Sequence, residues 1–333
     1  RRIMNQVVTH WAPRTRDYLP ESLRVEAGLL PISTALLQMH FPDSWEDLKA
    51  ARHRLAFDEI FLLQIGVLRQ KRAWESRDGR VIQVSDEWLQ ERIAGLPYTL
   101  TDAQQRSIAE LRADLISGRP MNRLLQGDVG SGKTVVAAMA IAMVAAGGAQ
   151  SALMAPTSIL AEQHARSLKQ YLCTDGNLLS EDQVRLLVGA TPATEKEEIR
   201  QRLAQGEIKL LIGTHALIED PVEFQDLQLA IVDEQHRFGV EQRAALRSKG
   251  ANPHLLVMTA TPIPRSLALT VYGDLDLSVM DEMPPGREQI STHVLLPRER
   301  ERAYSLIRSQ INNGQQAFII YPLVEESENS EAK

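Results

Sequence analysis

From about residue 96 onward, short apolar runs alternate with stretches in which apolar positions recur at helical spacing. The runs are the candidate strands Arg123–Gln126, Ser151–Ala155, Val184–Val188, Lys209–Ile212, Leu229–Val232 and Leu255–Met258. Strands and helices that alternate in this way form a parallel sheet with helices on both faces, joined by right-handed crossovers. Ligands bind at the carboxyl ends of the strands in such sheets. We therefore predict an α/β fold and look for its chemistry in the residues after each strand.

The chain before residue 96 has a helical pattern. Ser33 is expected to cap a short helix that ends near His40, and Ser44, with Asp47 three residues later, is expected to cap a long one. A further helix is expected near Asp86–Ile93. Apolar positions near helical spacing predict that the long helix faces a core, through Leu48, Ala51, Leu55, Ile60, Leu63 and Val67, widened by Phe57 and Phe61.

A basic cluster ends this long helix, at Arg69, Lys71 and Arg72. Cations in the last turn suit the helix dipole and are usually solvated, and this is the interpretation we favour. The same residues are candidates for contact with DNA phosphates.

A third segment follows Pro284-Pro285-Gly286, a sequence typical of a linker. It predicts one βαβ unit, made of a strand at Ile290–Leu296, a helix at about Arg298–Asn312 and a strand at Ala317–Tyr321. A lone unit of this kind cannot cover both faces of its sheet, so Ile311–Tyr321 is expected to leave apolar surface uncovered. The expected division of the chain is 1–95, 96–285 and 286–333.

Composition narrows the classes of protein. With 333 residues, 44% of them hydrophobic, the chain can build real cores, so it is not mainly disordered. Its 37 Lys and Arg against 43 Asp and Glu give a net charge of −6, which excludes a wholly basic nucleic-acid coat but not a local basic face. Cys173 is the single cysteine, which excludes an intrachain disulfide and a cysteine-rich zinc site and fits a reducing cytoplasm. The longest apolar run, Val135–Ala146, is too short to cross a bilayer and predicts a buried helix.

One motif identifies a phosphate-binding loop. The residues Gly127, Asp128, Val129, Gly130, Ser131, Gly132, Lys133 and Thr134 match G-x-x-x-x-G-K-[ST] at every fixed position. The motif follows an apolar strand and precedes a helix, which is the context it requires. Its backbone N–H groups and the helix N-terminus suit a phosphate, Lys133 reaches the β- and γ-phosphates, and the Thr134 hydroxyl is a ligand for Mg²⁺.

A second carboxylate site follows the strand Leu229–Val232, in the sequence Asp233-Glu234-Gln235-His236. Asp233 is the candidate Mg²⁺ ligand, and Glu234 is the candidate group that polarises the attacking water. Acids after a strand also cap helices, which is the structural alternative.

Asp-Glu-x-His resembles the second motif of superfamily 2 helicases, and further candidate motifs of that superfamily follow other strands. Pro156 and Thr157 through Gln163 resemble motif Ia, Gly213-Thr214-His215 resembles motif Ib, and Thr259-Ala260-Thr261 resembles motif III. Upstream, Leu100, Thr101 and Gln104 resemble the Q motif, whose glutamine reads adenine; an amide that both donates and accepts suits this role. Taken singly, Thr157 and Thr214 are equally well explained as helix caps, and His215 and His236 as core histidines. Hydroxyl and N–H groups at these strand ends predict DNA contact through the phosphate backbone, independent of base sequence.

Longer blocks resemble the RecG family of bacterial branched-DNA helicases. The blocks are Met121–Gln126, DEQHRFGV from Asp233, Met258–Arg265 (MTATPIPR) and Tyr272–Leu275 (YGDL). The resemblance extends from about Leu19 to the last predicted strand. The transcription-repair coupling translocases share several blocks, but there we expect Glu in place of Gln235 and a different sequence from Met280–Arg287. We keep this translocase as the second interpretation.

The resemblance implies an ATP- and Mg²⁺-dependent double-stranded DNA translocase of the bacterial cytoplasm, associated with the nucleoid. It would remodel stalled forks and move Holliday junctions. His236 would belong to the catalytic set, and Arg237, Thr259, Thr261 and Arg265 to the DNA-binding or coupling set. The implied partners are branched DNA and a single-stranded DNA-binding protein, without a membrane, and the intact protein would be a monomer.

The resemblance also implies three parts and an incomplete motor. Residues 1–95 would end the N-terminal wedge region and its linker helix, 96–285 would form a P-loop, RecA-like lobe 1, and 286–333 would begin lobe 2. Because the chain opens with Arg1-Arg2, we expect a piece of a longer protein, without the later motifs and their arginine finger. Such a finger contributes about 10³–10⁵ in turnover, so the chain is expected to bind nucleotide and hydrolyse it poorly.

Two other classes fit less well. A nucleotide-gated DNA-binding module without turnover has no use for the water-polarising Glu234. A small-molecule kinase has no role for Asp-Glu-x-His or Thr-Ala-Thr.

Overall fold

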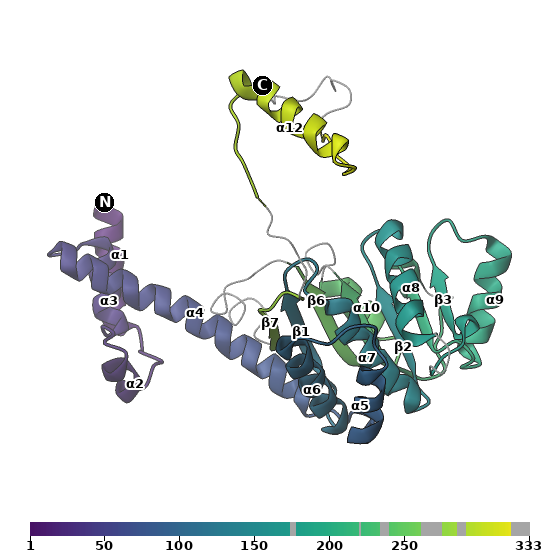
Figure 1. Ribbon diagram of the computed structural model, residues 1–333. Coiled ribbons are helices and arrows are strands. Elements are labelled where there is room, and N and C mark those ends of the chain that lie inside the picture. Colours follow the sequence, from purple (N-terminus) through teal and green to yellow (C-terminus); the bar gives the residue numbers. More distant parts are fainter. Residues whose placement is uncertain (174–177, 220, 234–239, 261–274, 285–290, 321–333) are drawn as a thin grey trace. The chain divides into compact units, whose positions relative to one another are not determined.

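The computed structural model describes residues 1–173, 178–219, 221–233, 240–260, 275–284 and 291–320 (Figure 1). The chain divides into two compact units, Arg1–Pro285 and Gly286–Lys333, which are treated separately below. Among the helices of the described ranges, none has both the length and the apolar character needed to cross a bilayer.

A parallel sheet of seven strands is the centre of the first unit, in the order β3-β4-β2-β5-β6-β1-β7. The strands are β1 (Asn122–Gly127), β2 (Gln150–Met154), β3 (Val184–Leu187), β4 (Leu210–Gly213), β5 (Leu227–Asp233), β6 (His254–Thr259) and β7 (Asp276–Met280). The six predicted strands are confirmed within a few residues of their expected ends. β7 was not predicted, since its residues Asp276–Met280 include only three apolar side chains and, among the described strands, it pairs with β1 alone.

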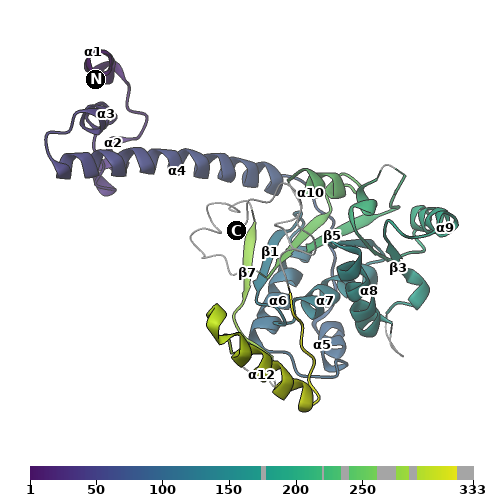
Figure 2. The ribbon, with the colours of Figure 1, turned by 90° about the horizontal axis from the view of Figure 1, so that it is seen from above.

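Helices cover both faces of the sheet, as predicted (Figure 2). One face packs against α5 (Asp86–Ala94), α6 (Asp102–Ile116), α7 (Lys133–Ala146) and α8 (Ser158–Leu172). The other packs against α9 (Ala193–Ala204), the 3₁₀ helix η3 (His215–Ile218) and α10 (Val240–Arg247). A second 3₁₀ helix, η2 (Glu181–Gln183), leads into β3.

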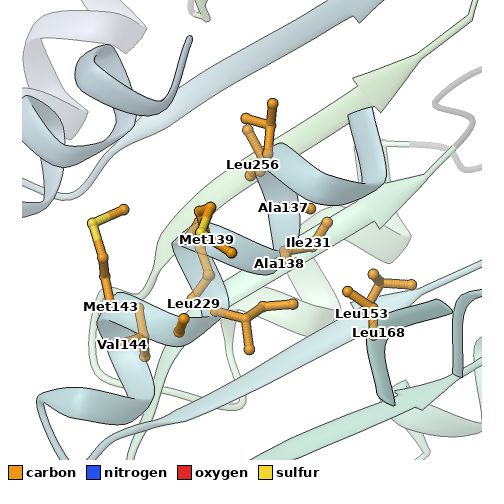
Figure 3. Packing of buried hydrophobic residues seen from close by; sticks show 14 of the residues in the cluster. Ala137, Ala138, Met139, Met143, Val144, Leu153, Leu168, Leu229, Ile231 and Leu256 are labelled. Atoms are coloured by element: carbon orange, nitrogen blue, oxygen red, sulfur yellow. The ribbon is translucent and has the colours of Figure 1, made fainter. Parts of the chain in front are cut away.

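The central strands contribute to both cores because their side chains alternate between the faces. Leu153 and Ile231 join the first core, while the next residues along, Met154 and Val232, join the second. Figure 3 shows the first core, in which Met139 of α7 lies near Leu229 of β5 and Ala138 lies near Ile231. The whole run Val135–Val144 of α7 is buried, which confirms the predicted buried helix.

The N-terminal helices of this unit are α1 (Arg2–Trp11), α2 (Glu21–Glu26), α3 (Ile32–His40) and α4 (Trp45–Glu75), with the 3₁₀ helix η1 (Ala12–Arg14). Ser44 caps α4 as predicted, its hydroxyl accepting from the Asp47 N–H. The predicted cap at Ser33 is wrong: α3 already begins at Ile32, with Pro31 at the N-cap, so Ser33 lies inside the first turn. The expected helix near Asp86–Ile93 is confirmed as α5, capped by Ser85.

Arg54 holds these helices together. Its side chain is fully buried and donates to Asp17 at 2.8 and 3.0 Å, to Asp58 at 2.9 and 3.1 Å, and to the Leu30 carbonyl at 2.6 Å. The guanidinium is the largest influence on Asp17 and holds the pKa of that carboxyl well below its usual range. A buried arginine needs this degree of pairing, because a charge taken out of water without partners is costly.

The core-facing prediction for α4 holds only for its first half. Ala51 is buried among the N-terminal helices, but Ile60 and Leu63 are 48% and 58% exposed. The helix outruns the small bundle formed by α1 and α3, and beyond Asp58 its apolar side chains have little to pack against among the described residues. Near its end, Lys71 pairs with Asp276 at 2.7 Å, and the Trp74 indole donates to the Pro120 carbonyl at 2.9 Å.

The second unit contains one 3₁₀ helix, η5 (Pro297–Glu299), and one α-helix, α12 (Arg300–Asn312), within its described part. The predicted helix is thereby confirmed. The two predicted strands do not form over the residues described, 291–296 and 317–320. Strands need a hydrogen-bonded neighbour, and none is present for them among the described residues. Ile311, Phe318 and Ile320 are 54%, 85% and 89% exposed, as expected for an uncovered unit.

Candidate nucleotide and DNA site

The carboxyl edge of the sheet collects the predicted motifs. Along it the P-loop follows β1, Thr259 ends β6, Asp233 ends β5, and the two remaining motifs follow β2 and β4. Register fixes these neighbours: Gln126 lies beside Thr259, Asp233 beside Met258, and Met154 beside both Val232 and Gly213. Because every strand is parallel, all five ends meet at one edge.

The P-loop is built for close approach of a ligand to the backbone. Gly130 and Gly132 have positive φ angles of 81° and 90°, which favour glycine. A Cβ on Gly132 would meet the Gln104 amide nitrogen at 2.2 Å, and one on Gly127 would meet Ser131 Oγ at 2.6 Å. The crown of the loop, Asp128–Gly130, is exposed, so it is accessible to a nucleotide.

The positions of two side chains, those of Lys133 and Ser131, indicate that a phosphate group fits this loop. Lys133 Nζ donates to the carbonyls of Gly127 and Asp128, at 2.8 and 3.0 Å, and so already lies over the loop. Ser131 Oγ is buried and has no hydrogen-bond partner among the described residues. A cation over the loop and an unpaired hydroxyl within it both suit a phosphate group. Thr134, the predicted Mg²⁺ ligand, is in the first turn of α7 and is half-buried.

Gln104 connects the Q motif to the P-loop. Its Oε1 accepts from the Thr101 N–H at 2.9 Å, completing a capping box at the start of α6, and its Nε2 donates to the Ser131 carbonyl at 2.9 Å. Leu100 beside it is 5% exposed. The spacing Thr-x-x-Gln is the capping-box signature, a signal that the sequence analysis overlooked. Adenine reading by Gln104 stays a prediction and would require these bonds to exchange.

The structure shows the position and the hydrogen-bond partner of Asp233, the predicted metal ligand. It ends β5 with a side chain 12% exposed, and its Oδ2 lies 2.6 Å from Nε2 of His164 on α8. The described residues contain no cluster of three or more His, Cys, Asp or Glu that would hold a metal alone.

The two motifs beyond β5 differ in their local roles. Thr157 caps α8, its hydroxyl accepting from the Leu160 N–H at 3.3 Å, so the helix-cap interpretation is confirmed there; Pro156 beside it is half-buried. Thr214 makes no side-chain cap bond, and His215 is exposed, so their structural alternatives are wrong. Gly213 is needed for space, since a Cβ would meet the Leu187 carbonyl oxygen at 2.1 Å.

The remaining predicted residues are placed as follows. Gln163 is on α8 and exposed, and Thr259 is 1% exposed at the end of β6. Five predicted site residues lie outside the described ranges: Glu234, His236, Arg237, Thr261 and Arg265. The site residue that the sequence analysis missed is His164, since a single histidine within a helix carries no motif of its own.

Sequence comparison shows that the chain is similar to known helicases. The model of the DEAD/DEAH box helicase family matches residues 101–270, just over half of the chain. The chain is 49% identical to the ATP-dependent DNA helicase RecG of Synechocystis sp. over 95% of its own length and 38% of that protein. It is 46% identical to the RecG of Thermotoga maritima, over 100% of its own length and 42% of that protein.

The fold is also similar to that of a solved RecG structure. The structure of RecG bound to a three-way DNA junction superposes with a TM-score of 0.81 at 43% identity, covering 97% of this chain and 43% of that one. The chain thus spans about two fifths of the length of these relatives. The chain belongs to the DEAD/DEAH box helicase family and is homologous to RecG helicases over nearly its whole length.

Proposed function

We propose that the protein is an ATP-driven motor on branched double-stranded DNA, which remodels stalled replication forks and moves Holliday junctions. The observation that carries this proposal is the single sheet edge on which the P-loop, Asp233 and the loops after β2 and β4 are neighbours. Nucleotide and DNA would then bind side by side along this edge, so that a change at one ligand could reach the other through neighbouring strands. The likeness to RecG, one example of which is solved with a three-way junction, supports the substrate class.

The chemistry of the site would be in-line attack of water on the terminal phosphate of ATP. The P-loop N–H groups and Lys133 would bind the phosphates, exchanging the bonds that Lys133 makes to the Gly127 and Asp128 carbonyls. Thr134 and Asp233 would hold Mg²⁺, which would supply positive charge to the phosphate oxygens. Glu234 would orient the attacking water, with His236 in the same catalytic set.

The DNA-facing part would be the edge beyond Asp233. Thr157 at the N-cap of α8 and Gln163 on α8 would offer a hydroxyl and an amide to the phosphate backbone. Gly213 at the end of β4, with Thr214 and His215 after it, would add backbone and side-chain groups. Arg237 and Arg265 would add positive charge, and Thr259 and Thr261 would transmit the nucleotide state. Contacts of this kind predict affinity that does not depend on base sequence and falls as salt rises.

The finer features of the resemblance belong to the same proposal. The working protein would act as a monomer, associate with the bacterial nucleoid and meet a single-stranded DNA-binding protein at the fork. Homologues named RecG, at 41–49% identity, favour this assignment over a transcription-repair coupling translocase.

The test is nucleotide binding and hydrolysis, with and without forked DNA. The chain should bind a fluorescent ATP analogue, and Lys133→Ala should abolish binding without lowering the melting temperature, because the Lys133 side chain is half-buried and its Nζ donates to carbonyls of the loop rather than packing in the core. The protein expressed over its full coding sequence should hydrolyse ATP faster with forked DNA, and Glu234→Gln should remove that turnover. Tight nucleotide and DNA binding with turnover unaffected by Glu234→Gln would instead indicate a binding module.

A further inference from the structure

A histidine interrupts the apolar face of α8. Ala161, Leu168 and Leu172 of this helix are buried against the sheet, and His164 lies on the same side, three residues after Ala161 and four before Leu168. Its side chain is 11% exposed. An apolar residue would be the expected choice at this position, so the imidazole calls for a polar partner.

The partner is Asp233. His164 Nε2 and Asp233 Oδ2 are 2.6 Å apart, and both side chains are nearly buried. An ionised carboxylate only accepts hydrogen bonds, so Nε2 carries the hydrogen and donates it. A donor fixed on a helix restricts rotation of the carboxylate, and in metal sites the groups that hold a ligand in this way tune metal affinity.

The same helix begins at the proposed DNA contact. Thr157 caps α8, and His164 lies seven residues later, two turns along on the same face. The strand before α8, β2, is also the immediate neighbour of β5, through the pair Met154 and Val232. One short helix therefore links the loop expected to meet the DNA backbone to the carboxylate expected to hold Mg²⁺.

We propose that His164 is a positioning residue that holds Asp233 for the nucleotide-bound Mg²⁺ and couples that carboxylate to the DNA-contacting start of α8. The inference rests on the proposed function of this edge and deepens it. A small shift of α8 when Thr157 meets a phosphate would move His164 with it, because the helix is rigid over two turns. Asp233 would then be repositioned without any contact of its own with DNA.

Variants of His164 separate this role from simple packing. His164→Leu fills the space without a donor, whereas His164→Gln places an amide N–H near the position of Nε2. Gln170→Ala is the matched control, since Gln170 is exposed on the same helix and lies beyond the residues that resemble motif Ia. Melting temperatures of all variants report any structural loss independently of function.

The first readout is the Mg²⁺ concentration needed for half-maximal binding of a fluorescent ATP analogue by the chain. His164→Leu should raise it about tenfold, as expected when a group holding a metal ligand is lost. His164→Gln should restore most of the difference, and binding in EDTA should be the same for all proteins. The second readout is the change in nucleotide affinity on adding forked DNA, which should shrink in His164→Leu and not in Gln170→Ala.

The outcomes are separable. If the unaltered chain binds neither ATP analogue nor forked DNA, the proposed function fails and this inference with it. If the unaltered chain binds both, and His164→Leu shows the same Mg²⁺ dependence and the same response to DNA, the inference alone is overturned. A lower melting temperature in His164→Leu with unchanged Mg²⁺ dependence assigns the histidine a packing role and also overturns it.

Discussion

Two regions of the first unit are stabilised by different means. The sheet and its helices are joined by two apolar cores in which side chains such as Ile231 and Val232 are fully buried. The N-terminal helices are joined instead around one fully buried arginine, Arg54, while apolar side chains of α4 such as Leu63 are exposed. The comparison teaches that an apolar periodicity places a residue on a helix face, whereas burial depends on what packs there.

The largest effect is expected from the sheet core. Ile231→Ala in β5 removes a fully buried side chain from a central strand, and should lower the free energy of unfolding by about 4 kcal/mol. Urea unfolding followed by circular dichroism measures this, with Ile231→Val as the control at about 1 kcal/mol. Equal losses for the two variants would mean that the site collapses around the cavity.

A loss confined to the N-terminal helices is expected from Arg54→Met. The substitution leaves Asp17 and Asp58 without their guanidinium and should cost about 3 kcal/mol locally. Hydrogen exchange should accelerate in α3 but not in β5, and adding Asp17→Asn and Asp58→Asn should recover part of the loss. Exchange that accelerates equally in β5 would show that the two regions unfold together, against the comparison.

A smaller difference between the sheet region and the N-terminal helices is expected in how their stability depends on pH. Burial lowers the pKa of His254, whose Nδ1 accepts from the Met121 N–H at 3.0 Å, against smaller raising effects of the Arg80 carbonyl and Asp114. The unfolded imidazole, with a pKa of 6.5, takes up a proton first, so this stability is complete above pH 6.5 and falls as pH drops toward the lowered folded pKa. The pKa of Asp17 is lowered from 3.8, so the stability that this carboxylate contributes is complete above pH 3.8 and is lost only as the pH falls below 3.8 toward the lowered folded pKa.

Urea midpoints at about pH 7.5 and about pH 5 test this expectation. The sheet region should be less stable at the lower pH than at the higher pH, whereas the stability of the N-terminal helices should not change. His254→Asn keeps an acceptor near the Met121 N–H and should flatten the pH dependence of the sheet region. An unchanged slope in this variant would place the titrating group elsewhere.

The smallest effect is expected on the exposed half of α4. Leu63→Ser removes a side chain that is 58% exposed and should change the free energy of unfolding by at most about 0.5 kcal/mol. Ala51→Ser, at a fully buried position on the same helix, is the contrasting variant and should cost more. Thermal melts of both variants measure the difference, and a large loss at Leu63 would mean that this face is covered in solution.

Much of the sheet was predictable from the chain alone. Runs such as Leu229–Val232 are buried on both faces of a parallel sheet, so they are continuously apolar and easily recognised. The edge strand β7 is mixed in composition and pairs on one side only within the described part of the chain, and it escaped prediction. The strands expected in 286–333 did not form in the described residues, because apolar runs become strands only beside a partner.

Some residues of the candidate site could likewise be predicted from the sequence, and others could not. The P-loop and Asp233 were found from local patterns, because phosphate binding by backbone N–H groups requires glycines at set spacings and a strand before them. The bond from His164 to Asp233 joins residues 69 positions apart and has no local signature. The second role of Gln104, at once a cap of α6 and a donor to the P-loop, also depends on the two elements being brought together.

The sequence by itself determined the α/β class, the strand ends at which chemistry is expected and the phosphate-loop motif, since each depends on side-chain periodicity or on backbone conformation within a few residues. The tertiary structure alone decided which apolar faces are covered, which aspartates share Arg54 and which histidine reaches Asp233. The reason is physical: periodicity and capping act over one or two turns, whereas burial and ion pairing depend on segments far apart in the chain that packing brings into contact.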